Sequence, residues 1–154
     1  MIIDRTYSDV ERAKEILKKL KSLEPISEEE YNILERGTVT YNTLNRIESK
    51  QREIAEKLLQ WHYLKRPIEN KIWTEKNIFS INDLERIVNN TINLRESFFV
   101  INDNIPNPQK TYFYIEFNSI EKILYEIYEL ILVTPQSFKY SGTFNSGQYY
   151  ILPQ

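Results

Sequence analysis

The residues that could do chemistry in this sequence are few and scattered. His62 is the single histidine and cysteine is absent, so a transition-metal site would need carboxylates for its other protein ligands. We therefore interpret His62 as a packing or surface residue. The lack of thiols also excludes disulfides and thiolate chemistry and is compatible with a reducing compartment. The sequence predicts no metal site and no cofactor.

Acidic residues offer two weak patterns. Residues 102–104, Asn-Asp-Asn, start like a calcium-binding loop, but such a loop has glycine at its sixth position and a bidentate glutamate at its twelfth. Here those positions hold Asn107 and Phe113. Glu126 and Glu129 have a spacing that suits an acid–base pair on a helix, but exposed helix faces carry such pairs routinely. With no glycine-rich phosphate loop and no nucleophile elbow in the sequence, we predict no catalytic residue and no enzymatic activity.

The composition is that of an ordinary globular domain with long helices. The chain has 154 residues and a formal net charge of −2, with only three glycines and as many as 11 tyrosines. Arg46, Lys50 and Arg52 lie close together along one predicted helix, but glutamates share that surface, so nucleic acid is not the expected partner. Charged residues at positions 4 and 5 argue against a secretory signal, and no apolar run approaches the ~20 residues of a membrane span.

Apolar residues that return every three or four positions predict a mostly helical protein. The longest predicted helix runs from Tyr41 to Leu64 and is capped by Thr40. Its outer face is expected to carry Glu48, Lys50, Arg52, Glu53, Glu56 and Lys57. The hydrophobic core is expected to contain Leu44, Ile47, Ile54, Leu58, Leu84, Ile87, Ile123 and Ile127.

Further helices are predicted from capping signals. They begin at Ser8, Ser27, Ser80 and Asn118, and the three serines form capping boxes with Glu11, Glu30 and Asp83 respectively. The second helix is expected to end in a left-handed conformation at Gly37. The last is expected to span Asn118–Val133, after a strand or extended approach over residues 112–117. The segment from Pro67 to Phe79 is a predicted connector that returns to the core through Ile72, Trp73 and Phe79.

The character of the sequence changes after Pro135. Two Ser-Gly pairs, several aromatic residues and no helical period predict a short β-hairpin or an extended arm. We therefore divide the chain into a helical bundle domain, residues 1–134, and a C-terminal arm, residues 135–154. An aromatic extended segment is suited to pairing with another chain. The expected protein-interaction residues are Phe138, Tyr140, Phe144, Tyr149 and Tyr150.

One six-residue pattern occurs at three predicted helix starts, residues 42–47, 82–87 and 118–123. It reads Asn, a small polar residue, Leu or Ile, Asn or Glu, a base, and then Ile. Two interpretations stay open: duplication of a helical unit, or the likeness that capping and amphipathicity impose on helix starts. In either case the base lies beside the buried face, where it is expected to pair with an acid on a neighbouring helix.

Residues 34–38, Leu-Glu-Arg-Gly-Thr, followed by residues 40–48, Thr-Tyr-Asn-Thr-Leu-Asn-Arg-Ile-Glu, resemble a segment of tail-associated structural proteins of Firmicutes phages and prophages. The opening Met1–Thr6 and the Ile78-Phe79 pair before a helix resemble the same group, so the likeness covers about residues 1–100. The resemblance implies a virion component, present in several copies, that holds other parts together.

The fold we expect is an all-α bundle of four or five helices with a long central helix and a short C-terminal hairpin or arm. The expected function is that of a non-enzymatic virion protein, a tail or baseplate adaptor that binds other virion proteins, forms a homo-oligomer and avoids membranes. Its expected location is the virion, assembled in the host bacterial cytoplasm. Two alternatives stay open: a head-to-tail connector, and a small phage-derived DNA-associated or regulatory helical protein.

Overall fold

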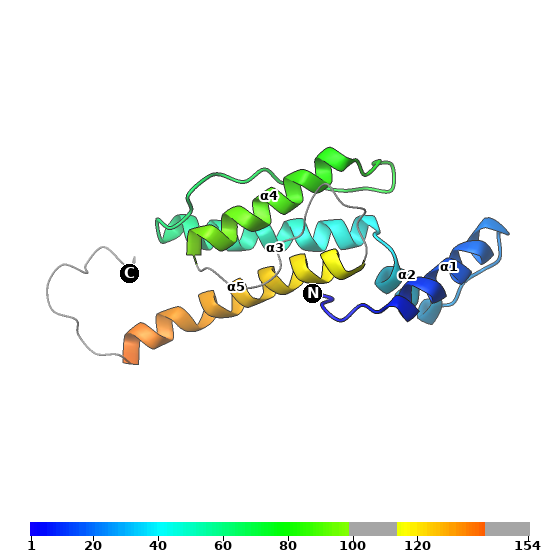
Figure 1. The fold of residues 1–154 in the computed structure, drawn as a ribbon, viewed down its shortest axis with the longest axis horizontal. Coiled ribbons are helices and arrows are strands. Elements are labelled where there is room, and N and C mark those ends of the chain that lie inside the picture. The colour runs from blue at the N-terminus through cyan, green and yellow to red at the C-terminus, as the bar shows by residue number, and fades with distance from the viewer. Residues whose placement is uncertain (99–113, 141–154) are drawn as a thin grey trace, which may run out of the picture.

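The fold is a parallel three-helix bundle with a helical hairpin at one end (Figure 1). A computed structural model describes residues 1–98 and 114–140, with the backbone alone for residues 136–140. Within these ranges the chain forms five helices and no strand, which confirms the all-α prediction. The helices are α1 (Tyr7–Lys21), α2 (Glu28–Gly37), α3 (Tyr41–Gln60), α4 (Ile81–Phe98) and α5 (Tyr114–Tyr140).

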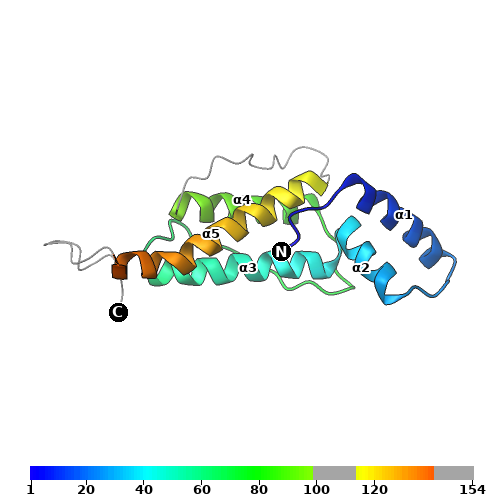
Figure 2. The same cartoon turned by 90° about the horizontal axis from the view of Figure 1, so that it is seen from below.

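The three long helices α3, α4 and α5 run in the same direction. Residues with higher numbers on one helix contact residues with higher numbers on its neighbour, as is expected when the helices are parallel. The contacts are Glu48 with Arg86 and Trp61 with Phe98 for α4, and Arg46 with Glu121 and Lys50 with Tyr128 for α5. In Figures 1 and 2 the colour scale by residue number advances in the same direction along each of these three helices. All three copies of the six-residue pattern therefore lie at the end of the bundle that adjoins the hairpin.

Two hydrophobic cores hold these parts together. The main core lies between α3, α4 and α5, and all eight residues predicted for it are buried. The hairpin of α1 and α2 has a small core of its own, made by Ala13, Ile16 and Leu34. The hairpin is therefore a separately packed unit, and Figure 2 shows it extending beyond the bundle.

The connector between α3 and α4 has no regular structure, so side chains satisfy its backbone polar groups. Asn45 on α3 accepts from the amide of Trp73 at 2.8 Å and donates to the carbonyl of the same residue at 2.9 Å. Asn90 on α4 donates to the carbonyl of Glu69 at 2.8 Å. Trp73 is buried in the main core as predicted, whereas the prediction for Ile72 was wrong because its side chain is largely exposed.

Three of the predicted N-terminal helix caps are present, and the first helix has a different cap from the predicted one. Ser27, Thr40 and Ser80 make the expected capping hydrogen bonds. The first helix is capped by Thr6 with Asp9 instead of Ser8 with Glu11, because Thr6 is the residue with extended backbone and its hydroxyl accepts from the amide of Asp9. The predicted end of α3 at Leu64 was also wrong, because the helix stops at Gln60 and the chain turns at His62 with a φ of 59°.

The last helix is longer than predicted at both ends. It begins at Tyr114, so residues 114–117 are helical and not a strand, and it continues through Pro135 to Tyr140. The predicted boundary at residue 135 therefore falls inside α5. An interior proline removes one backbone donor and crowds the carbonyl of the residue four positions earlier, yet α5 continues for five residues past Pro135. Residues 141–154 lie outside the described part of the chain, so the hairpin or arm predicted there stays a prediction.

Gly37 does not form the predicted left-handed cap. It is the last helical residue of α2, and Thr38 is the cap that follows. A Cβ atom at Gly37 would lie 2.2 Å from the carbonyl oxygen of Asp9 and 2.4 Å from the Cβ atom of Ala13. Glycine is therefore required here because α1 and α2 approach closely, and not because of backbone conformation.

Candidate functional site

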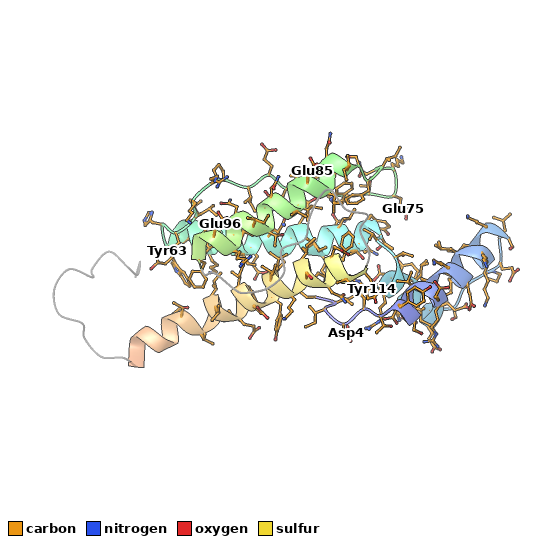
Figure 3. All side chains as sticks on the ribbon, in the orientation of Figure 1. Asp4, Tyr63, Glu75, Glu85, Glu96 and Tyr114 are labelled. Carbon is orange, nitrogen blue, oxygen red and sulfur yellow. The ribbon has the colours of Figure 1, made fainter. Side chains whose placement is uncertain are left out.

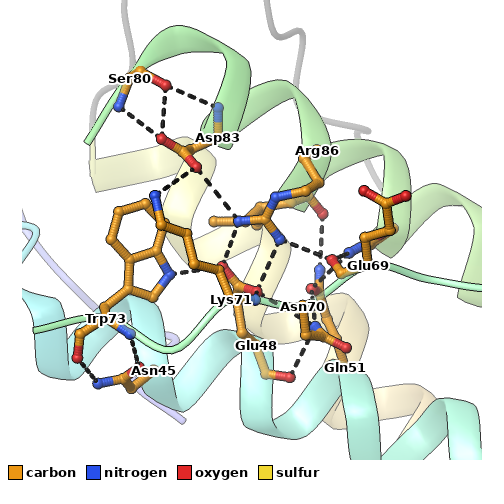
Figure 4. A network of polar contacts seen from close by, with 12 residues as sticks. Asn45, Glu48, Gln51, Glu69, Asn70, Lys71, Trp73, Ser80, Asp83 and Arg86 are labelled. Atoms are coloured by element: carbon orange, nitrogen blue, oxygen red, sulfur yellow. Dashed lines mark hydrogen bonds and ion pairs between the residues drawn. The ribbon is translucent and has the colours of Figure 1, made fainter. Parts of the chain in front are cut away.

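A buried carboxylate, Glu48 on α3, is the centre of a polar network that joins α3, α4 and the connector (Figure 4). Its Oε1 accepts from Nη2 of Arg86 at 2.7 Å and its Oε2 from Nη1 of the same guanidinium at 2.8 Å. The indole Nε1 of Trp73 donates to Oε1 at 2.7 Å, and the backbone amide of Lys71 donates to Oε2. The connector and α4 are thus fixed to α3 through one side chain.

These contacts set the ionisation of Glu48. Burial by itself raises the pKa of this carboxyl, but hydrogen bonds from Arg86, the amide of Lys71 and the indole of Trp73 outweigh burial and hold its pKa below the ordinary 4.5. A carboxylate has about four acceptor positions, and these donors fill them. Glu48 is therefore a charged structural group with no position left for a substrate proton.

The prediction that Glu48 lies on the outer face of its helix was wrong, since its side chain is 1% exposed. A signal for burial was present in the spacing. Glu48 follows Leu44 by four positions and precedes Gln51 by three, so it lies on the apolar stripe of the helix. Gln51 is also fully buried and donates to the carbonyl of Ile87.

A second buried carboxylate, Glu121 on α5, joins the N-terminal segment to the bundle. Its Oε1 accepts from Nη2 of Arg5 at 2.7 Å and from Nη2 of Arg46 at 2.9 Å, and its Oε2 accepts from the amide of Ile2. The side chain of Asn118 accepts from the amide of Arg5 at 3.2 Å and donates to its carbonyl at 2.9 Å. The segment before α1 is thereby held against α5.

These ion pairs test the expectation for the six-residue pattern. The bases of the first two copies, Arg46 and Arg86, pair with acids on neighbouring helices as predicted. The base of the third copy, Lys122, pairs with Glu126 on its own helix at 3.6 Å. The prediction is thus confirmed for two copies, although the acids are not equivalent, because Glu121 is the fourth residue of the third copy and Glu48 lies just after the first.

A cavity of about 290 Å³ lies where the hairpin meets the bundle. Its walls come from α1, the end of α2, the turn into α3 and the start of α5. The lining residues are Arg5, Tyr7, Val10, Lys14, Arg36, Gly37, Thr38, Val39, Tyr114 and Phe117. Figure 3 places Tyr114 beside the hairpin and Tyr63 at the opposite end of the bundle. This cavity is the candidate functional site.

The cavity has mainly apolar walls and three cationic side chains. Arg5 forms a buried ion pair with Glu121, and Arg36 forms an ion pair with Asp4 at 3.2 Å. Lys14 pairs with Glu11 at 2.7 Å, but both side chains are half exposed, and such a surface pair contributes little to stability. Of the three cations, the ammonium group of Lys14 is therefore the one that can most easily exchange its ion pair for a contact with a ligand.

No family model, curated protein or solved structure matches this chain. We therefore infer its function from the residues and their geometry. None of the helices in residues 1–98 and 114–140 is long and apolar enough to cross a membrane. In the same residues, no group of three or more histidine and carboxylate side chains is placed to hold a metal ion. His62 lies exposed at the turn after α3, as a surface residue.

Two of the five predicted interaction residues belong to a helix that the structure describes, and they lie away from this cavity. Phe138 and Tyr140 belong to the last turns of α5, at the end of this helix that is distant from the hairpin. Phe144, Tyr149 and Tyr150 lie outside the described residues. The cavity could not be recognised in the sequence because its walls come from segments that are distant in sequence, none of which carries a recognisable pattern. A helix-terminal glycine at position 37 was the one local signal of a close approach.

Proposed function

We propose that this chain is a non-enzymatic structural protein of a bacteriophage virion, an adaptor of the tail or baseplate that binds other virion proteins. The observation that carries the binding role is the apolar cavity at the junction of two separately packed helical units. Clefts between such units are common binding sites, and the volume of this one is at the lower end of ligand pockets. It suits one or two large side chains of a protein partner.

The chemistry around the cavity favours binding over catalysis. The described lining residues include cations and tyrosines, but neither a carboxylate nor a histidine that could act as a general base. The two most buried carboxylates, Glu48 and Glu121, are occupied by hydrogen bonds from the protein itself. Their charge is used to join segments that are distant in sequence.

The exposed apolar side chains near the cavity support the same proposal. Tyr7 and Val39 line the cavity with exposed fractions of 63% and 42%, so a partner that entered it would bury both. The resemblance of residues 1–100 to phage tail-associated proteins supplies the biological setting, with assembly in the host cytoplasm. Because Arg46 and Lys50 are paired with Glu121 and Glu53, we favour a protein partner over DNA.

The test is the presence of the chain in particles. Prophages of the bacterium that carries the gene are induced, particles are purified on a density gradient, and the full chain is followed by immunoblotting and mass spectrometry. We expect it to sediment with intact particles. A chain with Tyr7→Ser and Val39→Asp should be incorporated less, whereas Leu59→Ser, which changes an exposed apolar residue at the other end of α3, should be incorporated normally. A chain absent from every particle fraction would contradict the proposal.

The arm has its own test in the same system. Because α5 reaches Tyr140, the matching deletion removes residues 141–154 and leaves the helix whole. We expect unchanged helical content by circular dichroism and weaker incorporation into particles. Normal incorporation of the shortened chain would show that the arm is not a docking element.

A further inference from the structure

We propose that the cavity at the hairpin–bundle junction receives aromatic side chains from residues 141–154 of a second copy, so that copies of the chain associate head to tail. This inference deepens the proposed function and rests on it, because it treats residues 141–154 as a docking arm. It names one occupant of the cavity, and it identifies the partner as another molecule of the same chain.

The cavity lies at one end of the bundle, and residues 141–154 begin at the other end. Tyr114, the first residue of α5, lines the cavity, and Tyr140, the last, leads into residues 141–154. At ~1.5 Å per residue, these two residues are about 39 Å apart along the helix axis. Figure 1 shows the end of α5 directed away from the hairpin. The arm of any one molecule therefore starts far from the cavity of that molecule.

This separation favours the arm of a second molecule over the arm of the same molecule. A fully extended chain spans at most ~3.5 Å per residue, so Tyr150 lies no more than about 35 Å from Tyr140. Tyr149 and Phe144 reach less far. Only an arm stretched straight back along α5 in a fully extended conformation brings the backbone of Tyr150 level with Phe117, a lining residue of the cavity one turn inside α5. A second molecule has no such restriction, and its arm enters the cavity without being fully extended.

The chemistry of the two surfaces is complementary. Residues 141–154 contain three aromatic residues, Phe144, Tyr149 and Tyr150, and no charged side chain. The apolar walls of the cavity exclude water from an inserted ring, and the guanidinium of Arg36 and the ammonium of Lys14 can lie against its face. The same chain already uses such a contact, since Nζ of Lys50 lies 3.6 Å from the ring centre of Tyr128.

The contact has a predictable symmetry. Each molecule offers one cavity and one arm at opposite ends, so the interface joins two different surfaces. A heterologous interface of this kind closes into a ring when the rotation between copies permits it, and otherwise continues as a filament. Either product would hold several copies of an adaptor in a defined order.

The test measures self-association of the purified full chain by sedimentation velocity, up to about 100 µM. The cavity is altered by Val39→Asp and, in a separate chain, by Tyr7→Ser; both residues are exposed enough to change without unfolding. The arm is altered by Tyr149→Ser with Tyr150→Ser. Leu59→Ser is the matched control, because it removes an exposed apolar side chain far from the cavity. Circular dichroism establishes that every variant is folded.

We expect the unaltered chain and Leu59→Ser to associate equally, and each cavity or arm variant to associate at least about tenfold more weakly. An equimolar mixture of a cavity variant with the arm variant should form dimers and nothing larger, because one intact cavity meets one intact arm. A chain that stays monomeric, or an association that either type of variant leaves unchanged, would overturn the inference. Since the presence of the unaltered chain in purified particles does not depend on self-association, failure here and failure of the proposed function are distinguishable.

Discussion

Arg86 on α4 donates hydrogen bonds from both terminal nitrogens to the carboxylate of Glu48 on α3, at 2.7 and 2.8 Å. Glu48 is only 1% exposed. Two-point pairing of this kind fixes the rotation of one helix relative to the other as well as their separation. Because the same carboxylate also accepts from the connector, three segments of the bundle depend on one charge.

Removing the guanidinium should therefore destabilise the bundle strongly. Arg86→Met leaves Glu48 buried with no cation, and we expect a loss of about 3–5 kcal/mol in the free energy of unfolding measured with urea. In a double-mutant cycle, Glu48→Leu with Arg86→Met should cost less than the two single changes added together, by about 1–3 kcal/mol. Arg52→Met, at an exposed position of α3, is the control and should change stability by about 0.5 kcal/mol or less. Additive single changes would show that the pair is not coupled.

The charge of Glu48 should also make stability depend on pH. Its pKa in the folded chain lies below the ordinary 4.5, so its stabilising contribution is complete above about pH 4.5 and is lost as the pH falls through the folded-state value. Urea unfolding of the unaltered chain and of Glu48→Gln, from about pH 7 down to about pH 3, measures this contribution as a difference. We expect the difference to shrink as the pH falls. A difference that is constant or grows in acid contradicts this assignment.

Gly37→Ala should destabilise the hairpin, although alanine normally stabilises a helix relative to glycine. The added methyl group would overlap the carbonyl oxygen of Asp9, a backbone atom that cannot rotate away. We expect a loss of about 1–3 kcal/mol by thermal or urea unfolding. Asn32→Ala in the same helix is the matched control, since Asn32 is exposed and alanine has the higher helix propensity. The two alanine substitutions should have opposite signs, and equal signs would count against the close approach.

Asn45→Leu should release the connector locally. The change leaves the amide and the carbonyl of Trp73 without their partner, at a cost of about 1–3 kcal/mol for each buried group. In a Trp61→Phe background, the fluorescence of Trp73 should shift to longer wavelength and its amide should exchange hydrogen faster. Asn89→Ala, an exposed asparagine on α4, should leave both signals unchanged. A buried, unshifted Trp73 in the leucine variant would show that the main core alone holds the connector.

Much of the helical framework was predictable because its signals are local. Capping hydroxyls at Ser27, Thr40 and Ser80 and apolar spacing on one helix face depend on residues within one or two turns, and the eight predicted core residues are all buried. Where two hydroxyl residues can cap the same helix start, as Thr6 and Ser8 can at the start of α1, local reasoning selected the wrong one. The extension of α5 through Pro135 was not predicted for a related reason, because proline was expected to end the helix although the helix continues to Tyr140.

The burial of Glu48 and Glu121 and the cavity beside Gly37 could not be predicted in this way. Each depends on what a second segment supplies: a guanidinium from another helix, an amide from the connector, or the backbone of α1. A charged residue on the apolar face of a helix can be predicted as buried only if the oppositely charged side chain that another segment brings to it is known.

The sequence alone therefore determined which residues form helices and which faces of those helices are apolar, since both follow from interactions between near neighbours. Tertiary structure decided the parallel order of α3, α4 and α5, the pairing of buried charges and the cavity between hairpin and bundle. The physical reason is that desolvating a charge or opening a cleft is favourable only in the presence of groups far away along the chain.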